Sequence, residues 1–353
     1  MVVVVFFSVA FVVALAGYAF YKVFPMSAYL YADARASARS AELLKKEDYD
    51  RLTGASSFEA FVAGLKGTPY ECGCSDAREF HLMLEKKYLA EVMDMGKDTP
   101  DDYRAILDAQ MMRHEASTIK LLMKSKLKNT PLAEHLITPA GRVTAQLVAS
   151  LKSADTVGDM AVMLQRTSFA DLFASDFWKG KTWEETEMEI DGFITKRMRE
   201  TVSRAKIPEG RELLDLMGET FVANDLLLLV RAKLRGLSVE QQMALAEATE
   251  MGPVRGLANV PLEGITPESL PPVQILRDNS ELVAEGKVVE LEKKIGESLA
   301  SRTKQLAMFH PEGAYPIALY LLQKDGEKKA LQLISKAVEE QIPAERIMEL
   351  MAA

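Results

Sequence analysis

Three leucine-rich segments that recur at a nearly constant spacing constrain the fold of this chain more than any other feature. Residues 119–126 read IKLLMKSK, and a similar run, LLLLVRAK, lies 107 residues later at 226–233. A third run, LQLISKA at 331–337, follows after a further 105 residues. Each run carries Lys or Arg near its end, which is favourable at the C-terminus of a helix. The second run is apolar on all sides from Leu226 to Val230, as expected of a buried helix. The spacing predicts three copies of one helical unit.

Two further markers recur in the same order. A turn that ends in an aromatic residue, LKGTPY at 65–70, returns as LQRTSF at 164–169 and in degraded form at 276–280. An apolar stripe at helical spacing follows each turn. The three stripes are Leu84, Tyr88, Val92 and Met95, then Ile190, Ile194, Met198 and Val202, then Leu291, Ile295, Leu299 and Leu306.

These markers divide the chain into three helical domains at 26–142, 143–252 and 253–353, which we expect to be related by pseudo-three-fold symmetry. The proline-rich stretch 252–272 cannot continue a helix and is interpreted as a connection between repeats. The alternative is that any all-helical chain offers leucine stripes that slide into register. Three kinds of marker that keep their order and spacing favour the repeat.

The composition predicts an all-α body. Beyond the first 25 residues, Ala, Leu, Met, Glu, Lys and Arg dominate, and these are good helix formers. Hydrophobic residues make up 48% of the chain, which is enough for a core and excludes a disordered chain. Two cysteines exclude a disulfide scaffold, and a net charge of -8 argues against a nucleic-acid binder.

The first 21 residues carry no charged side chain, and that length is about what crosses a bilayer core. A cleaved signal peptide is the alternative, but no Lys or Arg precedes the run and the run is long. We therefore predict a single transmembrane anchor at residues 1–25, in contact with lipid. Basic residues follow on its C-terminal side only, which places the body on the cytoplasmic face of the cell membrane and the N-terminus outside. The anchor residues that we expect to contact the membrane are Val2, Phe6, Phe7, Phe11, Val12, Leu15 and Phe24.

No motif in the chain indicates an active site. Gly180-Lys181-Thr182 lacks the upstream glycine and strand of a phosphate-binding loop, and Thr118 stands where a zinc-protease helix beginning at His114 needs its second histidine. The four histidines are dispersed, and Cys72 and Cys74 have no second cysteine pair, so a structural loop is favoured over a metal site. We expect no catalytic, cofactor-binding or metal-ligating residue, no small-molecule substrate, and no enzyme activity in this chain.

The segment after the anchor carries a family resemblance. Tyr29-Leu30-Tyr31-Ala32-Asp33-Ala34-Arg35, with Leu43-Leu44 further on, resembles the opening of the C subunit of archaeal-type (A-type) rotary ATP synthases, the relative of the d subunit in eukaryotic V-ATPases. The segments 47–52, 65–70, 225–234 and 314–321 are also similar to that family, although it commonly has Asn where Asp225 or Thr118 stands here.

The resemblance implies a funnel of three helical bundles and a non-catalytic role in the central stalk, or rotor. Such a protein accepts the tip of the central shaft in its wide mouth and rests on the membrane ring of ion-carrying subunits, so that torque passes between ATP synthesis and ion transport. The shaft subunits and the membrane ring are then its partners. The alternative function is a membrane-tethered helical-repeat adaptor that binds a cytoplasmic partner on a concave face.

Four residues are expected to lie at the membrane-proximal end and to contact a partner. They are Tyr29, Tyr31, Arg35 and Arg39, with both tyrosines packed inward and both arginines reaching partner carboxylates or lipid phosphates. The alternative is that they are solvated residues without a specific contact. Residues 2–24 are expected to fill the apolar hole of the membrane ring as a coaxial plug, and the alternative places them in bulk lipid.

Overall fold

The computed structural model describes residues 27–132, 136–207, 210–248, 251–311 and 313–352. Apart from one isolated β-bridge between Ala140 and Val143, these residues form helices, turns and loops, which confirms the all-α expectation. The predicted transmembrane helix falls outside the described residues. No helix in the described ranges is long and apolar enough to cross a membrane.

Six helices of 21 to 28 residues form the frame of the described structure. At about 1.5 Å per residue they are roughly 30 to 40 Å long. They come as three consecutive pairs, one in each predicted repeat, and the two helices of a pair are joined by a short connection. The pairs are α5 (Ala77–Lys97) with α6 (Asp101–Lys128), α10 (Trp183–Arg204) with α11 (Arg211–Leu234), and α15 (Val288–Phe309) with α16 (Ala314–Glu339).

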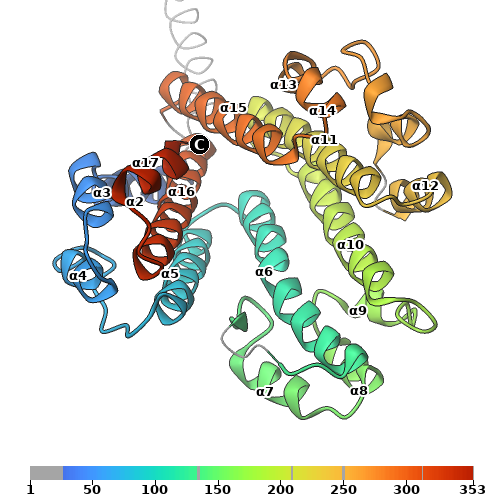
Figure 1. Cartoon of the computed structure of the whole chain (residues 1–353), viewed down its shortest axis with the longest axis horizontal. Coiled ribbons are helices and arrows are strands. Elements are labelled where there is room, and N and C mark those ends of the chain that lie inside the picture. Colours follow the sequence, from blue (N-terminus) through green and yellow to red (C-terminus); the bar gives the residue numbers. More distant parts are fainter. Residues whose placement is uncertain (1–26, 133–135, 208–209, 249–250, 312, 353) are drawn as a thin grey trace, which may run out of the picture.

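The three pairs close into a ring. Helix α6 packs against α10, α11 packs against α15, and α16 packs against α5, so every long helix has one neighbour from its own pair and one from the next. Figure 1 shows these helices around a common centre, with the short helices outside. We call the three contacts between different pairs the seams.

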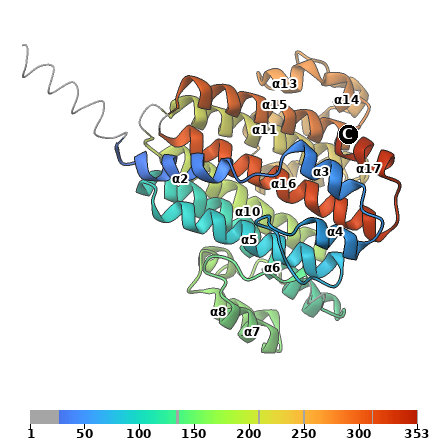
Figure 2. The same ribbon diagram turned by 90° about the vertical axis from the view of Figure 1, so that its left-hand side faces the viewer.

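One end of the ring is formed by the connections within the pairs, and we call it the hairpin end. Asp102 at the start of α6 accepts a hydrogen bond of 3.1 Å from Lys206 N, and Tyr315 at the start of α16 donates one of 2.8 Å to Glu212 at the start of α11. Helix α2 (Leu30–Ser40) begins at the same end, as Figure 2 shows. Hydrogen bonds therefore join the three pairs to one another where the described chain begins.

The short helices lie outside the ring. A first group packs against α5 and α16, a second near α6, and a third near α11 and α15 (Figure 1). The first group is α3 (Lys46–Thr53), α4 (Phe58–Gly64) and α17 (Ala344–Ala352). The second is α7 (Ala145–Ser153), α8 (Val157–Leu164) and α9 (Ala170–Phe173). The third is α12 (Val239–Ala248), η2 (Gly252–Asn259), η3 (Leu262–Gly264), α13 (Gln274–Asp278) and α14 (Ser280–Ala284).

The ends of the second long helices preserve the repeat register. Asn129, Gly236 and Gln341 each have left-handed backbone, with φ of 47°, 72° and 57°, and they lie at the predicted offsets of 107 and 105 residues. After each one, the next residue's N–H donates to a carbonyl five residues earlier, as in a Schellman C-cap. Gly and Asn adopt left-handed backbone readily at helix ends but Gln does not, so its recurrence at these offsets supports the repeat.

The first two copies of the turn marker also share their hydrogen bonds. Thr68 donates its hydroxyl to the Leu65 carbonyl at 2.6 Å and accepts from Tyr70 N at 3.2 Å. The second copy repeats this with Thr167, Leu164 and Phe169 at the same two distances. In the third copy, Asn279 N still donates to the Leu276 carbonyl, but no threonine is present.

The apolar core is shared across the seams. One cluster of buried residues runs from Tyr29 through α5, α6 and α10 to Phe221 and on to the start of α16. Another joins the first short helices to the end of α16, with Phe61 and Phe80 in edge-to-face contact at 5.1 Å. The apolar clusters therefore cross the predicted boundaries at 142 and 252, and those boundaries stay predictions.

Candidate functional site

Helix α2 is fixed to the hairpin end by its buried face. Tyr29 is 1% exposed, and its ring meets that of Tyr103 edge-on with centroids 6.2 Å apart. Asp33 on the next turn is 8% exposed and accepts a hydrogen bond of 2.8 Å from Gly313 N, in the connection before α16. Tyr29 is therefore packed inward, as expected, and α2 joins the first repeat to the third.

The two arginines of α2 pair with carboxylates of α5. Arg35 contacts Asp94 and Asp98, and Arg39 contacts Glu91 and Asp94. Hydrogen bonds from Arg39 and then Arg35 lower the pKa of Asp94 to about 2, so this carboxyl is ionised at neutral pH. Both arginines were expected to reach partner carboxylates or lipid phosphates, but here they bind carboxylates of their own chain, because α5 presents an acidic face to α2.

Large apolar side chains are exposed at the hairpin end, at the start of α2 and at the end of α15. The expectation that Tyr31 packs inward is wrong, since it is 64% exposed and sits 5.6 Å from the Arg35 guanidinium. Leu30 beside it is 57% exposed, and Met308 and Phe309 at the end of α15 are 73% and 71% exposed. We call Leu30, Tyr31, Met308 and Phe309 the apolar patch. Sequence analysis missed the last two because they lie beyond the apolar stripe of their helix.

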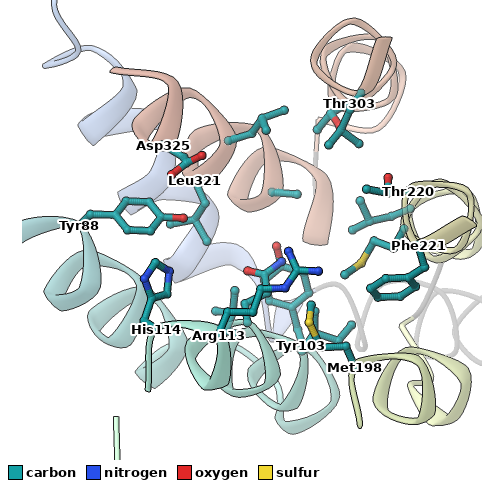
Figure 3. A pocket seen from close by; sticks show the side chains of 18 residues that line it. Tyr88, Tyr103, Arg113, His114, Met198, Thr220, Phe221, Thr303, Leu321 and Asp325 are labelled. Atoms are coloured by element: carbon teal, nitrogen blue, oxygen red, sulfur yellow. The ribbon is translucent and has the colours of Figure 1, made fainter. Parts of the chain in front are cut away.

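The centre of the ring holds a cavity of about 310 Å³, which we call the lumen. Its lining comes from all six long helices, and Figure 3 shows the side chains that point into it. Much of the wall is apolar. Its apolar side chains include Met198, Leu213, Met217, Leu299 and Leu322. Its polar side chains include Gln110, Arg113, His114, Thr220, Thr303 and Asp325.

Besides tyrosines, Figure 3 labels three ionisable groups of the lumen, and two of them have partners within the chain. His114 lies 2.7 Å from Glu85 on α5, and Asp325 lies 3.1 Å from Lys328 and 2.7 Å from Lys329. Burial raises the pKa of Glu85, but the hydrogen bond from His114 and the charge of Lys328 outweigh it and lower that pKa to about 2.

Arg113, the third of these groups, has different surroundings. It projects from α6 into the middle of the lumen (Figure 3). Water reaches its side chain, yet protein surrounds it, and this desolvation lowers the pKa of the guanidinium. Within the described part of the chain, no carboxylate lies within ion-pairing distance of Arg113.

Each of the three seams carries an ion pair whose carboxylate occupies the same position of the repeat. In each repeat, the residue directly after the first stripe position is a carboxylate on the first long helix, and it pairs with a base on the second long helix of the preceding repeat. The carboxylates become more exposed from one seam to the next, at 22%, 44% and 58%. The pairs are Glu85 with Lys328 at 3.1 Å, Asp191 with Lys120 at 3.0 Å, and Glu292 with Arg231 at 2.7 Å. We call them the seam pairs.

The rejected nucleotide and metal motifs have structural roles here. Gly180 is a turn residue with φ of 73°, and Thr182 caps α10, accepting a hydrogen bond from Glu185 N. Cys72 and Cys74 are free thiols, and burial raises the pKa of Cys74 to about 12. No group of three or more metal-binding side chains occurs among the residues that the structure describes.

The predicted anchor residues fall outside the described residues, and the partner contacts of α2 stay predictions.

Comparison with known proteins identifies the family. A model of the ATP synthase (C/AC39) subunit matches residues 32–350. Similar proteins include the C subunit of the A-type ATP synthase of Pyrococcus abyssi, 24% identical over 338 residues and covering 91% of this chain and 90% of that protein. The C subunit of the A-type ATP synthase of Methanothermobacter thermautotrophicus is 25% identical over 351 residues, covering 92% and 88%. This chain therefore belongs to the ATP synthase (C/AC39) subunit family.

Proposed function

We propose that this chain is a non-catalytic central-stalk subunit of an A-type rotary ATP synthase. In this role it accepts the tip of the central shaft in its lumen and rests with its hairpin end on the membrane ring. Torque then passes through it between ATP chemistry and ion transport. The family match and the names of the relatives support the complex, and the closed helical ring around a lumen supports the role within it.

One observation carries the proposed orientation. The described chain begins at the hairpin end, so the 21 uncharged residues at the N-terminus join the body there. The apolar patch lies at the same end. An exposed patch of large apolar side chains marks a surface that meets a membrane or another protein. We therefore propose that this end faces the bilayer, with residues 1–25 inserted, the body on the cytoplasmic face and the N-terminus outside.

The inserted segment has a proposed place on the ring axis. A protein seated on that axis directs its membrane end at the hole of the ring, and a helix without a polar face needs no hydrogen-bond partner there. Residues 2–24 would then rotate with the ring as a plug. Attachment to the ring through both this segment and the apolar patch would hold the body more firmly than either contact alone.

Transmission of torque requires that the body does not deform easily. Close-packed interiors have low compressibility and transmit strain. The apolar clusters that cross the seams and the seam pairs join one repeat to another, and the arginine contacts fix α2 to α5. A rotational force on the lumen wall is therefore distributed to the hairpin end through packed helices.

Deletion of the chain tests this function. In detergent-solubilised membranes from cells that lack it, the catalytic head and shaft should separate from the membrane ring, and ATP hydrolysis should no longer drive ion transport. Re-expression of the full chain should restore both. The adaptor alternative predicts that the head, shaft and ring still purify together and stay coupled.

A further inference from the structure

The lumen contains a positive charge that the rest of the chain does not balance. Asp325, His114 and their partners form closed ion-pair groups on α16, α5 and α6, which leaves Arg113 as the lining cation without an ion-pair partner in the described ranges. Asp191 attracts Arg113 from a distance but is itself bound to Lys120 at 3.0 Å. Arg113 is exposed to water in the lumen, so its guanidinium is accessible to an oxyanion that enters there.

The surroundings of Arg113 fit an oxyanion. The guanidinium presents up to five N–H donors in a planar fork that suits a carboxylate. Gln110 lies one turn before it on the same helix, and Thr303 on α15 also lines the lumen (Figure 3). Such a pair is stronger inside the lumen than on the surface, because less water screens it.

The size and the walls of the lumen favour a protein side chain over a free anion. A volume of about 310 Å³ corresponds to roughly ten water molecules at their share of liquid volume. That is room for a few side chains at the tip of a segment. The apolar side chains of Leu213, Met217 and Leu299 on α11 and α15 would contact apolar neighbours of the bound acid. They offer a small hydrated anion no hydrogen bond to replace those it makes with water.

We infer that the lumen binds an acidic side chain, an Asp or Glu flanked by apolar residues, at the tip of the central shaft, and that Arg113 is the residue that pairs with it. This rests on the proposed function, because it takes the shaft as the occupant. It adds which side chain of this protein recognises the tip and the chemistry of its counterpart. The pair would also fix the rotational position of the tip in the ring, since Arg113 lies on one wall only.

The test measures binding of the purified shaft subunits to the full chain in detergent micelles at low and high salt. Arg113→Glu should weaken binding at least tenfold at low salt, and Arg113→Lys should weaken it less because it keeps the charge. The matched control is Arg166→Glu, which makes the same charge change between α8 and α9, at an exposed position that does not line the lumen, and should change binding by less than twofold. An acid-to-lysine substitution at the shaft tip should restore binding to Arg113→Glu.

The outcomes separate this inference from the proposed function. If the unmodified chain does not bind the shaft subunits, the proposed function fails. If it binds them and Arg113→Glu binds equally well, only the inference is overturned. Inorganic phosphate at millimolar concentration is the competing ligand. If it displaces the shaft from the unmodified chain but not from Arg113→Gln, the site binds a free anion and the inference is overturned as well. If Arg113→Glu does not fold, Arg113→Gln replaces it in the same binding assay. The inference is then contradicted if salt weakens shaft binding by Arg113→Gln as much as it weakens binding by the unmodified chain.

Discussion

Asp225 offers a pH-dependent test of how the interface between α10 and α11 is built. Its side chain is 3% exposed, and its partner in the described structure is Arg199. Burial raises the pKa of Asp225 from 3.8 to about 7, although the charge and the hydrogen bond of Arg199 act in the opposite direction. The structure therefore predicts that desolvation dominates over pairing at this site.

The sign of the effect follows from proton binding. Between pH 3.8 and pH 7, the folded state holds a proton on Asp225 that the unfolded chain has lost, so the free energy of unfolding falls as pH rises. With these two pKa values, about 2 kcal/mol is lost between roughly pH 5.5 and pH 7.5. Above about pH 8.5 the carboxyl is ionised in both states and its contribution no longer changes.

Asp225→Asn isolates this contribution, because the amide keeps the shape and one acceptor oxygen for Arg199 but does not titrate. Urea unfolding of the full chain in detergent micelles, followed by circular dichroism in the far ultraviolet, gives the free energy of unfolding at each pH. The difference between the unmodified chain and the variant should fall by about 2 kcal/mol over this range and then level off. A difference that stays constant or rises with pH would show that the pair with Arg199 outweighs burial.

Three further predictions concern packing and the seams. Tyr29→Phe should leave the free energy of unfolding in urea unchanged or raise it by about 1 kcal/mol, since the buried hydroxyl has no hydrogen-bond partner in the described structure. Tyr29→Ala should lower it by about 3 kcal/mol or more, because it leaves a cavity. Gly141→Ala should destabilise more than Gly180→Ala in thermal unfolding: both have positive φ, but a methyl group at 141 would lie 2.1 Å from Glu115 and one at 180 meets nothing within 4 Å. Equal costs would contradict this. Glu85→Gln should destabilise the chain more than Asp191→Asn in parallel urea titrations, because pairing lowers the pKa of Glu85 whereas burial raises that of Asp191. Glu292→Gln, at an exposed pair, should lower the free energy of unfolding by less than about 1 kcal/mol. An effect of Asp191→Asn equal to or above that of Glu85→Gln would contradict this reasoning.

The sequence predicted those features of the fold that are encoded locally. Helix formation depends on neighbouring residues, so α6, α11 and α16 contain the leucine-rich runs as predicted. The left-handed residues Asn129, Gly236 and Gln341 were not predicted, but they recur at the same offsets. The threonine turn is local too, and its first two copies share their hydrogen bonds. Strong helix formers and repeated apolar stripes therefore sufficed to predict an all-α body with a repeated unit.

Features that depend on contacts between distant repeats were not visible in the sequence. Glu85 follows its stripe residue as Asp191 and Glu292 do, but nothing local to Glu85 identifies Lys328, far along the chain, as its partner. The same limitation explains why the partners of Arg35 and Arg39 on α2 were not predicted. The carboxylates that they bind lie more than fifty residues later, on α5. Arg113 looks like an ordinary surface arginine in the sequence, because only closure of the ring places it in the wall of the lumen.

Site-specific photo-crosslinking in the assembled complex tests the central claim, that the ring connects the shaft to the membrane rotor in one orientation, most directly. A photoreactive phenylalanine analogue at Phe309 probes the hairpin end, and one at Gln110 probes the lumen. The proposed arrangement predicts that position 309 forms adducts with subunits of the membrane ring and that position 110 forms them with the shaft. Adducts of position 309 with the shaft, or of position 110 with the ring, would contradict it.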